Sequence, residues 1–206
     1  AYLHVDAAQA FGKLIEPLRD PRIDFLSISG HKIYAPKGIG ALVARRRGYT
    51  RAPLQPLMYG GGQERGLRPG TLPVPLIAAL GLAARLALDE HNAWAQRCEE
   101  IKLEALNGLA PLEITMNGDP ARTIANTINL SVRGVDSEAA IVALKEVIAI
   151  SNGSACTSQS YEPSHVLTSA NLPEDQVGGA LRLSWSHLPP AVPWSLVSER
   201  LKRLVP

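Results

Sequence analysis

The chain has 206 residues, 46% hydrophobic and 19% charged, a globular composition that can bury a real core and excludes an intrinsically disordered chain. A formal net charge of +2 does not indicate the strongly basic surface that is typical of nucleic-acid-binding proteins. No apolar run is long enough to span a bilayer. We therefore expect neither direct nucleic-acid binding nor membrane association. The two cysteines, Cys98 and Cys156, have no paired spacing, which argues against a disulfide framework and indicates a reducing cytoplasm.

Short apolar runs separated by turn residues predict three strands in the first part of the chain, at 2–5, 24–29 and 40–44. A brief turn and helix connects the first two strands. The basic cluster of 45–47 with Arg51 follows the third strand, and we expect it to be a solvated strand end. Because the chain opens directly in a strand and lacks an initiator Met, we expect it to be part of a longer protein.

A glycine-rich loop at 54–72 precedes a helical pattern that runs from Pro75 to about Leu106. The first half of this helix is apolar nearly all round, which predicts burial between layers. The second half is amphipathic, and Cys98 lies on its apolar stripe, so we expect a core thiol. The change of character near Asp89 is the best domain boundary.

This boundary divides the chain into domains at 1–88 and 89–206. The second domain alternates strands, predicted at 112–116, 123–131, 148–150 and 180–186, with helices predicted at 137–147, 162–170 and 192–204. Asp136 or Ser137 is the expected N-cap of the first of these helices. Strands and helices in one compact block predict a small α+β domain, after a mixed α/β sheet in the first.

The first candidate site surrounds Lys32, which follows the second predicted strand. Burial disfavours a charged lysine, and the neutral amine is the form that attacks a carbonyl to make a Schiff base. A pyridine-type cofactor also needs a carboxylate at its ring nitrogen, which Asp6 could supply, while Gln9 could reach a phenolic oxygen. Ser29 and His31 flank the lysine and are placed to bind a phosphate.

Each of these residues also has a plain structural interpretation. Asp6 could cap a helix, Gln9 could lie on the surface, His31 could be an ordinary loop histidine, and Lys32 could point into water. A second candidate is Cys156, which lies in a run of small polar residues without an apolar stripe. An accessible thiol is a nucleophile once deprotonated, and an incidental exposed cysteine is an equal alternative. We expect no metal site.

Five motifs follow one another along the chain: HVDAAQ at 4–9, SISGHKIY at 27–34, PKGIGAL at 36–42, GGGQERGLRPGT at 60–71 and NGSAC at 152–156. In this order they closely resemble the cysteine desulfurases, pyridoxal-phosphate enzymes of the class V aminotransferase group. The last motif resembles the subgroup with a long mobile cysteine loop. The resemblance implies an α/β fold, the C-terminal part of a fold-type I pyridoxal-phosphate-dependent transferase, with the end of the large mixed-sheet domain and the small α+β domain.

The resemblance also implies how the first candidate residues act on pyridoxal 5'-phosphate. Lys32 would carry the Schiff base, Asp6 would pair with the pyridine nitrogen, and Gln9 would contact the phenolic oxygen. Ser29 and His31 would hold the phosphate.

Three further roles follow from the resemblance alone. Thr71 would help to hold the phosphate across a homodimer interface, and Arg182 would bind the substrate carboxylate. Cys156 would take the sulfur of L-cysteine as a persulfide, release L-alanine, and pass the sulfur to an acceptor protein. The acceptor pathway stays open between iron–sulfur assembly, tRNA thiolation and DNA sulfur modification.

Other functions remain as alternatives at this point. One is another class V pyridoxal enzyme, either an aminotransferase or a selenocysteine lyase, which the Gly-Ser-Ala-Cys motif disfavours. The other is an inactive fragment that serves only as an interaction module. The family has a further N-terminal half that supplies a phosphate-binding helix start, a ring-stacking histidine and an asparagine, none of which is in this chain. We therefore expect the chain alone to hold the cofactor poorly.

Overall fold

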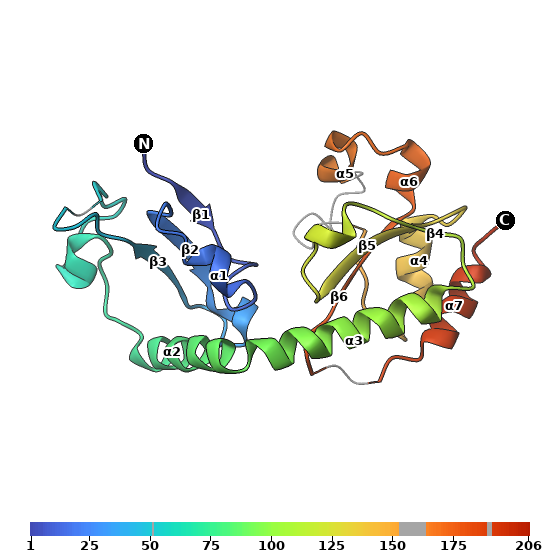
Figure 1. The fold of residues 1–206 in the computed structure, drawn as a ribbon, viewed down its shortest axis with the longest axis horizontal. Helices are drawn as coiled ribbons and strands as arrows, with labels where there is room; N and C mark the ends of the chain where they lie inside the picture. Colours follow the sequence, from blue (N-terminus) through green and yellow to red (C-terminus); the bar gives the residue numbers. More distant parts are fainter. Residues whose placement is uncertain (51, 153–163, 189–190) are drawn as a thin grey trace. The chain divides into compact units, whose positions relative to one another are not determined.

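A computed structural model describes residues 1–50, 52–152, 164–188 and 191–206 of the chain. The fold is mixed α/β, as expected, and forms two compact units at Ala1–His91 and Asn92–Pro206. Each unit is built on its own three-stranded sheet (Figure 1). Among the described residues, no helix combines the length and the apolar character that a membrane span requires.

The sheet of the first unit contains β1 (His4–Asp6), β2 (Phe25–Ser29) and β3 (Gly40–Ala44), in that order. β2 runs parallel to β1 and antiparallel to β3. These are the three strands that the sequence predicts, within two residues at each end. The parallel pair puts the carboxyl ends of β1 and β2 at the same edge.

The two faces of this sheet differ in chemistry because strand side chains alternate. Register pairs Asp6 with Ser27 and Val5 with Leu26. The Val5–Leu26 face joins a core that also contains Ala7, Ile23, Phe11, Leu18 and Ile28. The other face carries a polar row from the same two strands, consisting of His4, Asp6, Ser27 and Ser29.

Short helices connect the strands of the first unit. α1 (Ile15–Leu18) lies between β1 and β2, and η1 (Gly30–Ile33) follows β2 directly. η2 (Gln63–Gly66) lies in the glycine-rich loop, and α2 (Val74–Asp89) follows it. α2 packs against η1 through small residues, since Ala83 shares a core cluster with Ile33 and Ala35.

The prediction of one helix over 75–106 was wrong. α2 ends at Asp89, and α3 (His91–Leu109) begins two residues later. The expected burial of α2 between layers was also wrong, because Leu82 is 57% and Leu88 49% exposed. The physical reason is that only its alanine stripe faces the packed elements of this unit, so the leucines on its other sides remain in contact with solvent.

An ion pair in the first unit joins a buried carboxylate to a half-exposed arginine. Asp24 is 4% exposed and accepts hydrogen bonds from Arg47 Nε at 2.7 Å, Arg47 Nη2 at 2.8 Å and the Leu3 amide at 2.8 Å. The Arg47 side-chain hydrogen bond, followed by the Leu3 amide, lowers the pKa of Asp24 to about 2. Arg47 also lies over the Tyr2 ring at 4.5 Å. We expected the basic cluster after β3 to be a solvated strand end, but Arg47 of this cluster is the ion-pair partner of Asp24.

The second unit has an antiparallel sheet of β4 (Ile114–Met116), β5 (Thr127–Val132) and β6 (Ala180–Ser184), in that order. Its other elements are α3, η3 (Pro120–Arg122), α4 (Ser137–Leu144), α5 (His165–Ser169), α6 (Glu174–Gly178) and α7 (Trp194–Lys202). One apolar face of the sheet packs with α3, α4 and α7, through a core that includes Leu109, Leu130, Leu144, Leu181 and Leu201.

Two local predictions in this unit were confirmed. Cys98 is buried, and its carbonyl accepts a 3.0 Å hydrogen bond from Trp185 Nε1. Asp136 is the N-cap of α4, where its Oδ1 accepts from the amides of Glu138 at 3.0 Å and Ala139 at 2.9 Å.

In the same unit, one predicted strand was wrong and one short helix was not predicted. The predicted strand at 148–150 does not form; Ile148 and Ile150 instead pack their side chains against the core, which accounts for their apolar pattern. Only Ser151 pairs with a strand, through an isolated bridge to Arg182. The single turn of α6 was not predicted, because two glycines at its end obscure the helical pattern. Part of the helix predicted at 162–170 falls outside the described residues.

Candidate active site

Four of the predicted site residues lie at the carboxyl edge of the first sheet. Asp6 ends β1, Ser29 ends β2, and His31 and Lys32 belong to η1, which begins at the next residue. The Ala7 amide donates to the Ser27 carbonyl at 2.9 Å, which fixes the exit of β1 beside β2. The edge therefore gathers a carboxylate, a hydroxyl, an imidazole and an amine, as open α/β sheets do at sites of chemistry.

Gly30 determines where η1 starts. Its amide donates to the Ile39 carbonyl at 2.9 Å, and an added Cβ would lie 2.9 Å from that same oxygen. Only glycine permits so close an approach. At the other end of η1, Tyr34 has a left-handed φ of 68° and its amide donates to the Gly30 carbonyl. The turn that carries Lys32 is thus bonded to the residue before β3 at its start and closed onto Gly30 at its end.

Lys32 is half-buried. Within the part of the chain that the structure describes, its amine makes no hydrogen bond and no ion pair. Lysines of stable folds usually reach solvent or a carboxylate partner. A half-buried amine without a partner at a sheet edge is available for a ligand, including a carbonyl carbon.

Ser29 and His31 form a pair beside this lysine. Ser29 Oγ and His31 Nδ1 are hydrogen-bonded at 2.9 Å. A similar pair, which sequence reasoning missed, lies on the same polar face of the sheet: His4 Nε2 and Ser27 Oγ are 2.7 Å apart. The strand alternation that puts His4 and Ser27 on the face of Asp6 is the signal that could have found it. A hydroxyl and an imidazole at one edge are suited to phosphate oxygens.

Asp6 and Gln9 are both exposed. Asp6 Oδ1 accepts from the Ala8 amide at 2.9 Å, which holds the carboxylate in a local turn and leaves its second oxygen for a partner. Gln9 Oε1 accepts from Lys13 Nζ at 3.3 Å. Among the described residues, Gln9 is therefore hydrogen-bonded to a residue of the same segment and to none of the other candidate residues. Thr71 is exposed, and no contact in the described residues joins it to the other candidates.

Arg182 lies in the second unit, in the middle of β6, opposite Asn129 of β5. Its backbone makes two hydrogen bonds with Ser151, at 2.6 Å and 3.2 Å. Its side-chain Nε is buried and has no hydrogen-bond partner among the described residues. A guanidinium donor without an acceptor is costly in a folded protein, and a bound anion would supply the acceptor. Cys156 lies outside the described residues.

The residues at the first edge fit pyridoxal phosphate. The test is the Lys32 amine, which follows the Ser29–His31 pair at the same edge as the Asp6 carboxylate. Among the described residues, neither this amine nor the second oxygen of Asp6 has a hydrogen-bond partner. An amine for an aldehyde, a carboxylate for a ring nitrogen and donors for a phosphate are the groups that this cofactor requires. No group of His, Cys, Asp and Glu side chains in the described ranges could hold a metal ion.

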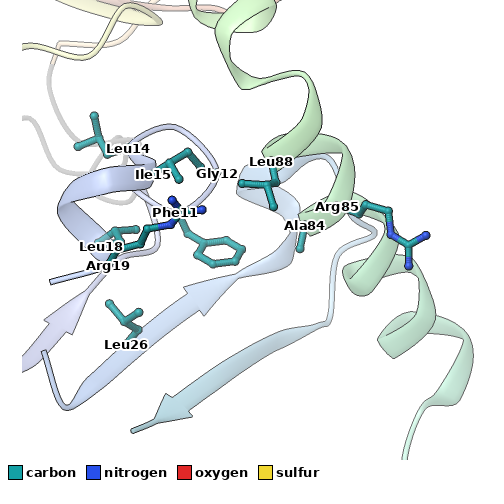
Figure 2. A pocket seen from close by; sticks show the side chains of 10 residues that line it. All are labelled: Phe11, Gly12, Leu14, Ile15, Leu18, Arg19, Leu26, Ala84, Arg85 and Leu88. Carbon is teal, nitrogen blue, oxygen red and sulfur yellow. The ribbon is translucent and has the colours of Figure 1, made fainter. Parts of the chain in front are cut away.

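A separate apolar pocket of about 470 Å³ lies on the other side of the first unit. Figure 2 shows Leu26 of β2, Leu18 of α1 and Leu88 of α2 around it, with the Arg85 guanidinium directed away. None of the candidate residues lines this pocket, and it offers few polar groups. It continues the apolar face of the sheet and is not part of the candidate active site.

Comparisons with known proteins agree with the motifs. Residues 1–188 match the family described as Aminotransferase class-V. A rat (Rattus norvegicus) protein named cysteine desulfurase is 45% identical over 185 residues, which cover 88% of this chain and 40% of that protein. The chain thus spans about two fifths of the length of this curated relative.

Two solved structures extend the likeness to the fold. DndA from Streptomyces lividans is 47% identical, with a TM-score of 0.76, and the match covers 90% of this chain and 52% of DndA. A structure described as SspA in complex with cysteine is 39% identical, with a TM-score of 0.68, over 93% of this chain and 51% of SspA. The same mixed α/β fold therefore occurs in both.

Proposed function

The chain belongs to the class V aminotransferase family, and from that premise we propose that it is part of a cysteine desulfurase that uses pyridoxal 5'-phosphate. The reaction would convert L-cysteine to L-alanine and transfer the sulfur to Cys156. The observation that carries this proposal is the unpartnered, half-buried amine of Lys32 beside the Ser29–His31 pair. The rat relative that is named cysteine desulfurase, and SspA in complex with cysteine, support it.

The proposal concerns the chain together with the rest of the protein, because the chain spans only part of its relatives. We assign residues 1–88 to the C-terminal part of a cofactor-binding domain, and residues 89–206 to a small domain that contains Cys156. The family likeness also favours a homodimer, to which Thr71 would contribute across the interface, and an acceptor protein for the sulfur. The cysteine content favours the cytoplasm.

Each candidate residue has a role at the cofactor in this proposal. Lys32 would hold the aldehyde carbon, and Ser29 with His31 would hold the phosphate. The Asp6 carboxylate would keep a proton on the ring nitrogen. Gln9, whose Oε1 accepts from Lys13, would donate an Nε2 hydrogen to the phenolic oxygen. When bound, the cofactor supplies an electron sink for the substrate.

The sulfur chemistry would fall to the second unit. Arg182 would bind the substrate carboxylate and so orient the amino acid. The Cys156 thiolate would attack the substrate sulfur; its S–S bond forms as the substrate C–S bond breaks, and the electron pair stays on the substrate carbon. That carbon takes up a proton, which yields L-alanine and a persulfide on Cys156. An acceptor thiol then removes the outer sulfur.

Chain geometry supports the pairing of Arg182 with Cys156. The backbone of Ser151 is hydrogen-bonded to that of Arg182. Cys156 follows Ser151 by five residues, and five residues span at most about 18 Å. The chain length therefore lets Cys156 reach a substrate held by Arg182 in this proposal.

The test is the release of alanine from L-cysteine by the complete enzyme, and of sulfide when a thiol reductant is added to reduce the persulfide. We expect Lys32→Ala to lose the visible absorption of the bound cofactor. We expect Cys156→Ser to keep that absorption and to lose sulfide release by about a hundredfold or more, as for removal of a nucleophile. Cys98→Ala is the matched control, since it removes the chain's other thiol and should leave turnover intact.

If Cys156→Ser still produced alanine from cysteine at full rate, another class V activity would be the better assignment. A wild-type enzyme without a visible band would favour the interaction module.

A further inference from the structure

One face of the second sheet is polar, and Arg182 lies on it. The register pairs Thr127 with Ser184, Asn129 with Arg182 and Ser131 with Ala180. Because side chains alternate along strands, these six residues share one face, while Ile128, Leu130, Leu181 and Leu183 face the core. The Ser131–Ala180 end of this face is buried, and Ser131 there contacts α6. Among the described residues, a ligand can therefore approach the face at the Asn129–Arg182 and Thr127–Ser184 pairs.

A hydrogen-bond network fixes the side chain opposite Arg182. Asn117 is 8% exposed, and its Nδ2 donates to Asn129 Oδ1 at 2.7 Å and to Ser131 Oγ at 2.8 Å. Ser131 Oγ in turn donates to the Gln176 carbonyl of α6 at 2.6 Å. Both N–H groups of Asn117 are thereby used, and the amide of Asn129 is held with its oxygen toward Asn117.

This orientation leaves the donor end of Asn129 without a partner. In the described part of the chain, Asn129 Nδ2 makes no hydrogen bond, and Arg182 Nε is buried without an acceptor. Side chains directly opposite each other on antiparallel strands have Cβ atoms about 4.5–5.5 Å apart. One neutral and one cationic donor therefore stand side by side on the same face, which is an arrangement that suits the two oxygens of a carboxylate.

We propose that Asn129 is a substrate-binding residue, whose Nδ2 binds the carboxylate of the amino-acid substrate together with Arg182. Asn117 is the positioning residue that holds the Asn129 amide. The inference rests on the proposed function, since it extends the substrate site of the same enzyme. The neutrality of Asn129 matters, because a carboxylate at this position would pair with Arg182 and occupy the guanidinium itself. Asn129 thus keeps Arg182 available to the substrate.

The experiment follows the Nε–Hε signal of Arg182 by nuclear magnetic resonance in the ¹⁵N-labelled 206-residue chain, with Arg182→Lys to assign it. The probes are L-alanine and sodium propionate. In the wild type, both should shift this signal in a saturable way. Asn129→Ser should weaken the binding of each probe about tenfold to a hundredfold, as expected for one lost hydrogen bond to a charged group. Asn129→Asp should shift the signal before any probe is added and weaken binding about twentyfold or more.

Thr115→Asp is the matched control. Thr115 lies on the same polar face but on β4, opposite Ser131 and away from Arg182. A carboxylate there should leave the titration unchanged, which separates pairing with Arg182 from a general effect of negative charge. Asn117→Ala should weaken probe binding about two- to fivefold by releasing the Asn129 amide. A purely structural role would lower the melting temperature and leave the affinity of the probes as in the wild type.

Two results would overturn the inference. One is a wild-type Arg182 signal that responds to neither probe, and the other is an Asn129→Ser variant that binds both as tightly as the wild type. The Ser variant decides the matter if Asn129→Asp does not fold. Failure of the proposed function looks different: the complete enzyme would release no sulfide from L-cysteine, while the Arg182 signal would still respond to carboxylates in an Asn129-dependent way.

Discussion

Gly30→Ala tests whether the turn that carries Lys32 is built as the structure shows. The new Cβ would lie 2.9 Å from the Ile39 carbonyl oxygen, 2.9 Å from Ile39 Cγ2 and 3.2 Å from the Ala35 Cβ. The carbonyl oxygen belongs to the backbone and already accepts the Gly30 N–H at 2.9 Å, so it cannot move without losing that bond. Overpacking of this kind typically costs about 1–3 kcal/mol of folding free energy.

The assay is thermal unfolding followed by circular dichroism. For a chain of this size, each kcal/mol corresponds to about 2–4 °C in melting temperature, so Gly30→Ala should melt about 2–12 °C lower. In the complete enzyme it should also reduce the visible cofactor band, because Lys32 moves with the turn. Gly81→Ala is the matched control: it lies inside α2 with open space around its Cβ position, and should raise stability by about 0.5–1 kcal/mol. A Gly30→Ala variant as stable as the wild type would refute the close packing of η1 on the segment before β3.

Two further predictions concern carboxylates that each stabilise one of the two units from within. Asp24→Asn should lower the melting temperature at pH 7. Because folding lowers the pKa of Asp24 from 3.8 to about 2, the stabilisation is present above pH 4 and is lost as the pH falls from about 4 to 2. The melting temperatures of wild type and variant should therefore converge in that window, and a constant difference would contradict the ion pair with Arg47. Asp136→Ala should cost about 0.5–2 kcal/mol through loss of the α4 cap, measured by thermal unfolding against Asp136→Ser, which keeps a capping oxygen.

The strands of the first sheet could be predicted because their signals are local. β3 begins and ends at the predicted residues, since Gly40 and the basic residues after Ala44 bound a short apolar run. The change of character near Asp89 indicated a domain boundary, but neither glycine nor proline indicated that the helix itself breaks at Glu90. At 148–150 the apolar pattern was real, but it reflects packing against the core of the second unit and no ladder formed.

The candidate site was predictable only in part for a related reason. Asp6, Ser29 and Lys32 follow strand ends, so the rule that chemistry gathers there was enough to find them. The Asp24–Arg47 pair spans 23 residues and the Asn129–Arg182 pair spans 53, and such pairings depend on strand register that periodicity does not reveal. The buried Nε of Arg182 is likewise a property of packing, visible only once the strands are assembled.

The alternation of side chains along β6 limits insertions and deletions within this strand. Leu181 and Leu183 anchor the strand in the core, and Arg182 between them faces the other way. If one residue of β6 were deleted, the residues on one side of the deletion would face the opposite side of the sheet. Either Arg182 would then face the core, or every β5–β6 pair would shift by one residue. Within β6, a single register therefore determines both which side chains enter the core and which face carries Arg182. A homologue that keeps this core with a one-residue insertion in β6 would need another position for the residue that we propose to bind the substrate carboxylate.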